Sequence, residues 1–377
     1  MKEPALDSGI LLIYKPKDIS SFGVVARARK MLGMRKVGHL GTLDPFAVGI
    51  LPIVFGRGTR LTQYLMDHDK TYRVKIALGI ATDTMDRDGT VVAKSVLSEE
   101  RIRELTEEDC QEIRFTVDSL VGEQEQKPPM YSAVKVEGKP LYHYARRGEE
   151  VVRAARKIEV YSAELLEVKQ DYSFYFPSDK TLILDIIIHC SKGTYIRVLA
   201  DELGRSLGSF AYASELERAK VGSLSCDQAI ELEQAESLFR NIDQNNRLWI
   251  SMLKQSGHII SLEQAVTDFP ALNLDYSQAL QISSGMTIPG QEIIAIQTNR
   301  KTQQSGTQID LCNTSVKAQL ESMRSSAGNS LRKEVISLFW RGRLLALARF
   351  TEDDKIQPET VFITREELIS EKRNEDS

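Results

Sequence analysis

Runs of apolar residues and residues at helical spacing predict interleaved strands and helices at the start of the chain. The segment 9–16 is almost continuously apolar and closed by proline, which is typical of a buried strand. After it, apolar residues recur at helical spacing as far as Gly33, with Ser20 or Ser21 available as the helix N-cap. The segment 49–56 has the pattern of a second buried strand.

The same patterns continue through the middle of the chain. They predict helices over 59–69, 98–112, 194–208 and 227–239, and strands over 70–79 and 181–190. The segment 126–151 differs, because it holds three prolines, two glycines and aromatics between basic residues. We expect a projecting loop there, with a short helix over 140–147.

The character of the chain changes near residues 256–269. A length of 377 residues favours two domains, and 42% apolar residues suffice for two cores. We expect a first domain over 1–255, a smaller β-rich domain over 256–365 and a solvated tail over 366–377. The stretch 297–333 is polar and poor in aromatics, which predicts a surface insertion.

Charge is unevenly distributed along a chain whose formal net charge is −4. Seven basic residues and one acid lie between Lys15 and Lys36, and seven basic residues and three acids lie between Lys135 and Lys157. Such patches are compatible with a polyanionic partner, although a solvated mixed surface explains them equally well.

Neither a membrane span nor a cysteine-based site is expected. The longest apolar runs are too short to cross a membrane and the N-terminus has no signal-peptide core, so we expect a cytoplasmic protein. The four cysteines are widely spaced and form no CxxC pair, which argues against zinc or a disulfide framework. The turn 82–89 resembles a calcium loop, but Thr84 occupies its first ligand position and Ser95 stands where a bidentate glutamate is needed, so we interpret it as a polar turn.

The stretch VGHLGTLDPFAVGILPIVFG, residues 37–56, builds a constrained loop around a lone carboxylate, Asp44. Such a group can be a nucleophile, a general base, a metal ligand or a turn residue before Pro45. His39 is a candidate base or substrate contact, or an ordinary loop histidine. No second carboxylate lies nearby in sequence, which weakens a two-carboxylate glycosidase hypothesis.

Two further segments hold candidate site residues. Tyr195 and Arg197 follow a predicted buried strand at the start of a helix, where an arginine can pair with a buried carboxylate or lie on the surface. Tyr72 is either a core aromatic or a surface on which a base can stack.

Taken together, these segments resemble the TruB family of tRNA pseudouridine synthases. The matching motifs occur in the family's order: GILLIYKPKDISS, GHLGTLDPFAVGILPIVFGRGTRLTQYL, DKTYRVKIALGIATDTMDRDG, CSKGTYIRVLADELGRSLG and LERAKVG. The segment from PPMYSAVKVEGKP to Tyr161 resembles the family's RNA-gripping insertion, about 123–157. The resemblance covers most of residues 9–235, and the later segments NLDYSQALQISSGMTIP and RGRLLALARF resemble a small PUA-type domain.

The resemblance implies a fold and a set of roles. The fold is α+β, with a central mixed, mostly antiparallel sheet flanked by helices and a small β-rich PUA-like C-terminal domain. Asp44 would be the essential aspartate, Arg197 its partner and Tyr72 the residue that stacks on the target uracil. The remaining implied substrate-binding residues are His39, Tyr195, Leu216, Lys15, Pro16, Lys135, Arg146 and Arg147.

The implied activity is isomerisation of uridine to pseudouridine at position 55, in the T-loop of tRNA. The reaction needs no metal or cofactor, and we expect a monomer that binds the T-arm. A tRNA-folding chaperone with a weak or absent catalytic role is the alternative, and a cofactor-free N-glycosidase is a third hypothesis.

The chain departs from the family pattern at a few positions. Asp18 stands where the KPxG motif has glycine, which matters if that turn needs a positive φ. Leu40, Phe46 and Val48 are small changes in the catalytic loop. The acidic net charge is unusual for an RNA-binding family, and the insertion 297–333 has no counterpart.

Overall fold

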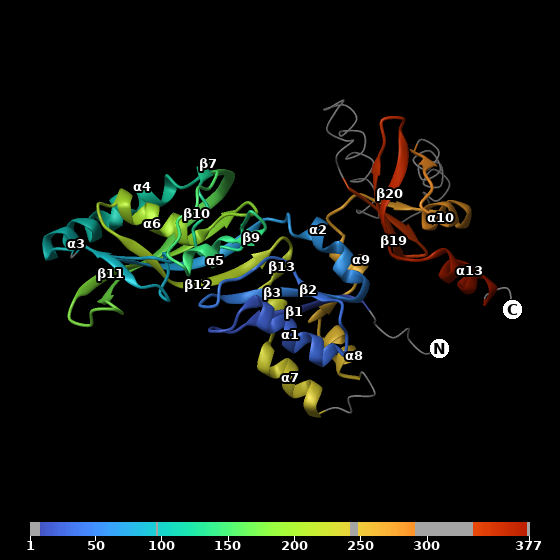
Figure 1. Cartoon of the computed structure of the whole chain (residues 1–377), viewed down its shortest axis with the longest axis horizontal. Coiled ribbons are helices and arrows are strands. Elements are labelled where there is room, and N and C mark those ends of the chain that lie inside the picture. Colours follow the sequence, from blue (N-terminus) through green and yellow to red (C-terminus); the bar gives the residue numbers. More distant parts are fainter. Residues whose placement is uncertain (1–7, 96, 242–247, 291–334, 375–377) are drawn as a thin grey trace, which may run out of the picture. The chain divides into compact units, whose positions relative to one another are not determined.

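The computed structural model describes residues 8–95, 97–241, 248–290 and 335–374. Within them the chain forms two compact units, one from Leu11 to Ile259 and one from Ile260 onward, which also takes in the short segment that ends at Ile10 (Figure 1). The predicted insertion 297–333 and Cys312 lie outside the described residues. No helix in the described ranges is long and apolar enough to cross a membrane.

A large mixed sheet forms the centre of the first unit. Its main path runs β14-β1-β3-β12-β4-β11-β10-β7, and β2, β13 and β15 pair at its sides. Most neighbouring strands are antiparallel, whereas β12 and β3 run parallel. The strands are β1 (Gly9–Lys15), β2 (Val37–His39), β3 (Val48–Phe55), β4 (Lys70–Leu78), β7 (Gly122–Gln126), β10 (Arg156–Tyr172), β11 (Lys180–Cys190), β12 (Ala211–Val221), β13 (Leu224–Ser225), β14 (Ile230–Glu231) and β15 (Ile259–Ile260).

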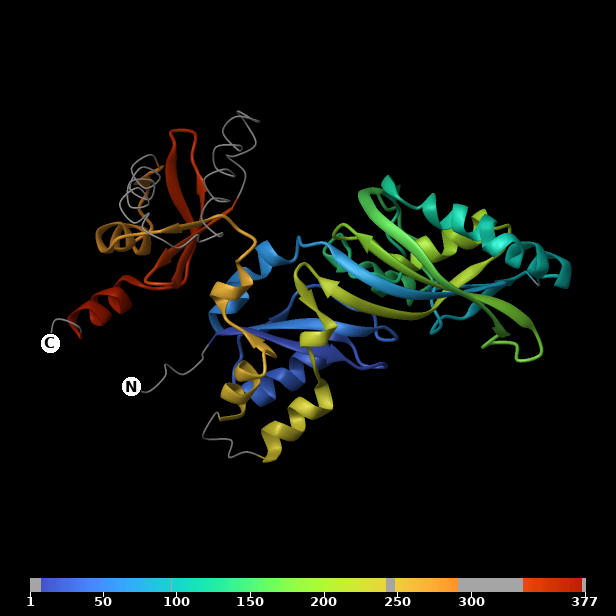
Figure 2. The same ribbon diagram turned by 180° about the vertical axis from the view of Figure 1, so that it is seen from behind.

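Helices cover this sheet in two groups. In Figures 1 and 2, α3 (Glu99–Thr106), α4 (Gln111–Asp118) and α6 (Ile196–Ser206) lie along one face of β4, β10 and β11. The second group, α1 (Ser21–Leu32), α7 (Leu232–Asn241) and α8 (Leu248–Gln255), packs on the half that contains β1 and β3. One continuous apolar core runs through both halves, from Leu11 to Ile259.

Local sequence signals explain the first strand and helix. β1 is buried along nearly its whole length, as its apolar run predicts. The α1 helix begins after Ser20, whose hydroxyl accepts a hydrogen bond from the Gly23 amide at 3.0 Å, and ends at Gly33 with φ +64°.

The structure corrects several predicted helices. The segment 59–69 forms a 3₁₀ turn, η1 (Gly56–Leu61), and only a single-turn helix, α2 (Thr62–Leu65). The acidic helix 98–112 breaks after α3, because Glu108, Asp109 and Cys110 all take positive φ values. Helix α7 begins later than predicted, since 230–231 form the parallel edge strand β14 beside β1.

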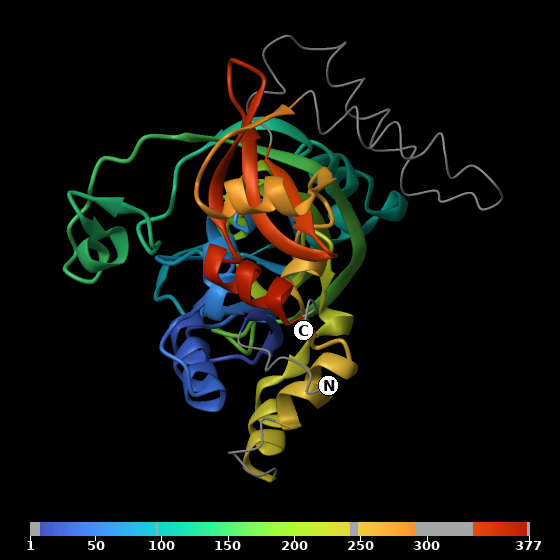
Figure 3. The same cartoon turned by 90° about the vertical axis from the view of Figure 1, so that its right-hand side faces the viewer.

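The segment 126–151 is an extended projection, as predicted. It carries a small hairpin, β8 (Lys135–Val136) and β9 (Lys139–Pro140), followed by the short helix α5 (Leu141–Ala145). Figure 3 shows this green segment standing away from the rest of its unit. Two further short strands, β5 (Ile80–Thr82) and β6 (Val91–Lys94), form a separate hairpin.

The second unit is a small β domain with its own core. Its five-stranded sheet has the order β16-β18-β19-β20-β17. These strands are β16 (Ala271–Asn273), β17 (Ile288–Pro289), β18 (Ile336–Trp340), β19 (Arg343–Phe350) and β20 (Lys355–Val361), with helices α9 (Leu262–Ala265), α10 (Tyr276–Ser283) and α13 (Arg365–Arg373). The expected combination of a mixed α+β domain with a β-rich C-terminal domain is confirmed.

The end of the chain differs from the predicted solvated tail. Residues 365–373 form α13, which begins with a capping box between Thr364 and Glu367. Leu368 is fully buried in the second core, and this burial holds a polar helix in place.

Candidate active site

Asp44 lies in the loop between two antiparallel strands. β2 pairs with β3 through Val37 opposite Phe55 and His39 opposite Ile53, so the connection 40–47 leaves one end of this hairpin. The amide of Ala47 closes the loop by donating to the Asp44 carbonyl at 3.2 Å. The two strands of this hairpin therefore hold both ends of the loop that carries the carboxylate.

Residues from the first motif fix the backbone on both sides of Asp44. The Ser21 hydroxyl accepts from the Leu43 amide at 2.8 Å and donates to the Leu43 carbonyl at 2.9 Å. On the other side, Lys15 Nζ donates to the Pro45 carbonyl at 3.0 Å. Both clamps are buried, which limits the positions that the loop can adopt.

The unusual Asp18 takes the backbone conformation for which glycine is ordinarily chosen. Its φ is +63°, in the left-handed region, and its amide donates to the Pro45 carbonyl at 2.9 Å. Aspartate is one of the few residues with a side chain that tolerates this region. The departure from the KPxG motif thus preserves the turn.

Arg197 holds the Asp44 carboxylate with two nitrogens. Its Nε lies 2.9 Å from Oδ2, and its Nη2 donates to Oδ1 at 3.3 Å. The arginine side chain is 4% exposed whereas that of Asp44 is 33% exposed, so the carboxylate is paired on one side and open on the other. A bidentate pair of this kind fixes orientation as well as charge.

A second carboxylate shares the same guanidinium. Asp86 Oδ2 lies 3.2 Å from Arg197 Nη1, which also donates to the Thr84 carbonyl at 2.7 Å. Burial raises the pKa of Asp86, although Arg197 opposes that effect. Asp86 was not predicted as a site residue, because 82–89 has the pattern of a polar turn and an aspartate in such a turn carries no further signal.

Tyr72 and Asp44 line one cavity of about 400 Å³, together with Arg197. Tyr72 lies on β4 between Ile188 of β11 and Arg218 of β12. Burial raises its pKa, so the ring presents a neutral phenol. The cavity has the size of a small-molecule site and can admit a single nucleobase.

Two other predicted residues also line this cavity. Leu216 is 6% exposed and supplies an apolar wall from β12. Tyr195 lies at the start of α6, where Gln126 binds its backbone twice, through the amide at 2.8 Å and the carbonyl at 3.1 Å. The structure thus brings together Asp44, Arg197, Tyr72, Tyr195 and Leu216.

The remaining predicted residues lie outside the cavity lining. His39 ends β2, where burial lowers its pKa, and its Nδ1 is buried without a hydrogen-bond partner among the described residues. Lys15 is buried and supports the loop from behind, through the Pro16, Ile19 and Pro45 carbonyls. Pro16 contributes only its backbone to that arrangement.

Lys135, Arg146 and Arg147 lie on the projecting segment. The Arg146 guanidinium lies 5.6 Å from the Tyr142 ring centroid, and that of Arg147 lies 5.5 Å from the Tyr144 ring centroid. The base of the projection contacts the reaction site, since Arg197 Nη2 donates to the Tyr131 carbonyl at 2.9 Å.

Three cations at the cavity were not singled out from the sequence. Lys70 is buried and donates to the carbonyls of Met66 and His68, while Arg156 lies at the start of β10. Arg218 is also buried and belongs to LERAKVG, a segment in which only Leu216 was given a role. Isolated basic residues are common at surfaces, so the sequence offers no sign that these reach a cavity.

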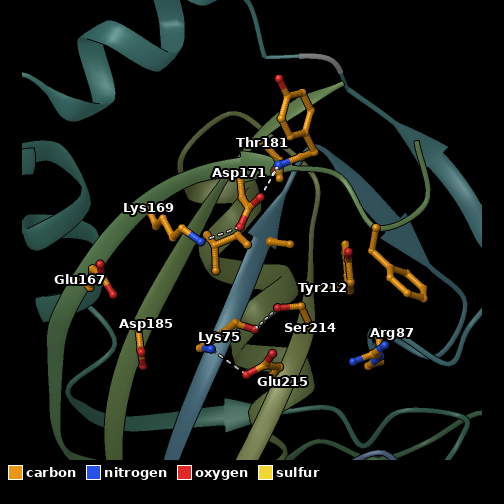
Figure 4. A pocket seen from close by; sticks show the side chains of 14 residues that line it. Lys75, Arg87, Glu167, Lys169, Asp171, Thr181, Asp185, Tyr212, Ser214 and Glu215 are labelled. Carbon is orange, nitrogen blue, oxygen red and sulfur yellow. Dashed lines mark hydrogen bonds and ion pairs between the residues drawn. The ribbon is translucent and has the colours of Figure 1, made fainter. Parts of the chain in front are cut away.

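A second cavity of about 330 Å³ lies on the other face of β4, β11 and β12 (Figure 4). Most of its charges neutralise one another: Lys75 lies 2.8 Å from Glu215, and Lys169 lies 2.8 Å from Asp171. These ion pairs are exposed to solvent, and such pairs are ordinary features of a protein surface that do not indicate a reactive group. The unshared edge of Asp44 makes the first cavity the stronger candidate for chemistry.

No group of three or more metal-ligating side chains occurs within the described ranges. The first cavity can support nucleophilic attack by the Asp44 carboxylate. Arg197 keeps that carboxylate charged, and the Tyr72 ring lines the same cavity.

The chain is similar to proteins of one known family. Residues 29–196 match the model of the TruB family pseudouridylate synthase N-terminal domain. A tRNA pseudouridine synthase B of Aromatoleum aromaticum is 43% identical over 230 residues, which is 61% of this chain and 68% of that protein. Another from Clostridium tetani is 37% identical over 287 residues, which is 76% of this chain and 88% of that protein.

A solved structure extends the similarity of fold to both units. A chain from a crystal structure of a Cbf5-Nop10-Gar1 complex aligns with a TM-score of 0.60 and 22% identity, covering 97% of this chain and 89% of that one. The relatives confirm the resemblance drawn from the motifs: the chain belongs to the TruB family of pseudouridylate synthases.

Proposed function

We propose that this protein isomerises uridine to pseudouridine in the T-loop of tRNA, at position 55. The observation that carries the proposal is one cavity in which a half-paired Asp44 carboxylate, the buried Arg197 and the Tyr72 ring meet. Tyr195 and Leu216 line the pocket for the target base. Relatives named tRNA pseudouridine synthase B support the choice of tRNA.

The reaction exchanges one glycosidic bond for another. The N1–C1′ bond of uridine breaks, the uracil turns, and a C5–C1′ bond forms. C5 then loses its proton and N1 gains one, so the product is an isomer of the substrate. Asp44 forms a transient covalent bond with the nucleotide, at C1′ or C6, and is released when the product forms.

The base must leave the RNA stack before it can enter the cavity. Flipping costs a few kcal/mol, and stacking on an aromatic ring returns roughly 1–3 kcal/mol. Tyr72 is our candidate for that ring, and His39 is our candidate for a residue that helps to receive the flipped nucleotide. Because misplacement by about 1 Å can reduce a rate 10²-fold, the clamps of Lys15 and Ser21 on the Asp44 loop favour this function.

The other parts of the chain receive roles in binding. The projecting segment with Lys135, Arg146 and Arg147 grips the T-arm, and the domain 256–365 is a PUA-like RNA-binding module. The catalytic domain spans 1–255, and the protein works as a cytoplasmic monomer. A chaperone without catalysis remains the alternative, but it would not require the paired carboxylate.

Mapping of pseudouridine in tRNA after incubation with the purified protein tests the proposal. We expect conversion at position 55, in whole tRNA and in a T-arm stem-loop, and none when uridine 55 is replaced by cytidine. Release of free uracil would instead indicate an N-glycosidase. Binding without any change in the RNA would indicate a chaperone.

A further inference from the structure

Arg218 is a buried cation that no carboxylate neutralises among the residues that the structure describes. The residue is 1% exposed, and all three of its guanidinium nitrogens donate to backbone carbonyls. Nε donates to Ile50 at 3.0 Å, Nη1 to Thr42 at 3.3 Å and Nη2 to Gly41 at 3.2 Å. Removing a guanidinium from water costs free energy unless such hydrogen bonds compensate for it. An apolar side chain could fill a core without that cost, so the hydrogen bonds of Arg218 indicate a role beyond filling space.

The three carbonyls belong to the two ends of the Asp44 loop. Gly41 and Thr42 precede Asp44, and Ile50 follows it on β3. The approach of β12 to β3 is correspondingly close: a Cβ at Gly49 would lie 2.4 Å from the Arg218 carbonyl oxygen. Gly49 also has φ +108°, so only glycine lets the two strands meet here.

Arg218 is also a neighbour of Tyr72 in the sheet. It is the register partner of Tyr72 across β12 and β4, and its charge acts on the Tyr72 phenol to oppose the effect of burial. One planar side chain thus binds the loop that carries the carboxylate and also acts on the Tyr72 phenol.

We propose that Arg218 is a positioning residue that sets the spacing between the Asp44 loop and Tyr72. It does so from the wall of the cavity, by donating to the carbonyls of Gly41, Thr42 and Ile50, without bonding to the reacting base. Its effect on catalysis rests on the function proposed above, whereas its effect on loop order does not. Lysine should replace it poorly, because its three donors share one nitrogen, whereas the guanidinium places its donors on three separate nitrogens in a fixed plane.

The variant Arg218→Lys tests this role, with Arg73→Lys as the matched control. Arg73 lies on the opposite face of the same sheet, pairs bidentately with Asp185 and has a side chain that is 51% exposed. Both proteins would be compared with wild type by amide hydrogen exchange over 40–47, single-turnover pseudouridine formation at saturating tRNA, and tRNA affinity. Circular dichroism would set a temperature at which every variant is folded.

We expect the amides of 40–47 to exchange their hydrogens at least about tenfold faster in Arg218→Lys than in wild type. Its single-turnover rate should fall about 100-fold, with tRNA affinity changed less than about threefold. Arg73→Lys should leave all three unchanged. Wild-type exchange over 40–47 in Arg218→Lys would overturn the proposal, whether or not the protein makes pseudouridine, and so would a rate loss fully matched by lost affinity. Absence of pseudouridine in the wild-type arm would overturn only the proposed function.

Discussion

Lys15 Nζ donates a hydrogen bond to the carbonyl of Pro45, the residue that follows Asp44, across 30 positions of sequence. Ser21 clamps the residue that precedes Asp44 in the same way. The candidate nucleophile is therefore held by side chains from a distant motif as well as by its own hairpin. Nucleophilic attack requires accurate placement of the carboxylate, and these hydrogen bonds supply that placement.

The buried Lys15 should leave a mark on the pH dependence of stability. Burial lowers the pKa of Lys15 from 10.5 to about 8, against the opposing effect of Asp44. Between those values the unfolded chain binds a proton that the folded chain does not, so this group's contribution to stability rises with pH from about 8 to 10.5. Chemical denaturation across that window should show the rise in wild type.

Two variants separate Lys15 from other titrating groups. Lys15→Met should lose this part of the rise, by at most about 1.4 kcal/mol per pH unit. Lys17→Met, at an exposed lysine two residues on, should keep it. If the stability of Lys15→Met and of wild type changed with pH in parallel, Lys15 would have the same proton affinity in the folded and the unfolded chain.

Asp86 should matter for turnover although it does not line the cavity. The Asp86→Asn variant weakens one of the contacts that orient Arg197 toward Asp44. A hydrogen bond to a charged group contributes about 1.5–3 kcal/mol, so the single-turnover rate should fall roughly 10- to 100-fold. The measurement is tritium release from C5 of labelled uridine in tRNA at saturation.

Asp185→Asn is the matched control for this prediction. Asp185 is also buried and paired with an arginine, Arg73, but on the other face of the sheet. It should lower stability without reducing the rate of the folded enzyme. An equal rate loss in both variants would mean that the effect of Asp86 is a general one on the fold.

Sequence patterns predicted the main residues of this site, but not the buried residues that support them. The strand that follows Asp44, β3, was predicted from its apolar run, whereas the short strand β2 before it was not. The motifs placed Asp44, Tyr72 and Arg197 in one site. Asp86 and Arg218 were missed because their roles depend on which turn and which strand lie beside them in space. A buried Arg218 beside Gly49 follows from a parallel pairing that periodicity cannot specify.

Two elements were not predicted because tertiary contacts, rather than the local sequence pattern, determine their conformation. Residues 365–373 look solvated, yet one buried leucine, Leu368, and a capping box fix them as a helix. The long strand β10 was not predicted at all, because most of its residues are polar or charged. Its pairing with the apolar β11 over eleven register positions decides its conformation instead.

The projecting segment should grip RNA through phosphate contacts. Replacing both Arg146 and Arg147 with alanine should weaken tRNA binding and flatten its dependence on salt, by roughly 0.7–0.9 log units per lost contact. The rate at saturating tRNA should change little, since neither residue lines the cavity. Filter binding across a salt series measures the slope.

The control for that series replaces two exposed arginines elsewhere, Arg103 and Arg114. They lie on α3 and α4, in the acidic stretch of the chain, and each is paired with a nearby acid. Their removal should leave the slope unchanged. If the Arg146 and Arg147 variant keeps the wild-type slope and affinity, the basic run on the projection is an ordinary solvated surface.

The most direct test of the whole account is the single-turnover rate of Asp44→Asn at saturating tRNA, with affinity measured alongside. Asparagine has nearly the same shape as aspartate but lacks the nucleophilic carboxylate. We predict no detectable pseudouridine and tRNA affinity within several-fold of wild type. A rate within about tenfold of wild type, or about 1.4 kcal/mol of barrier, would contradict the assignment of Asp44 as the nucleophile.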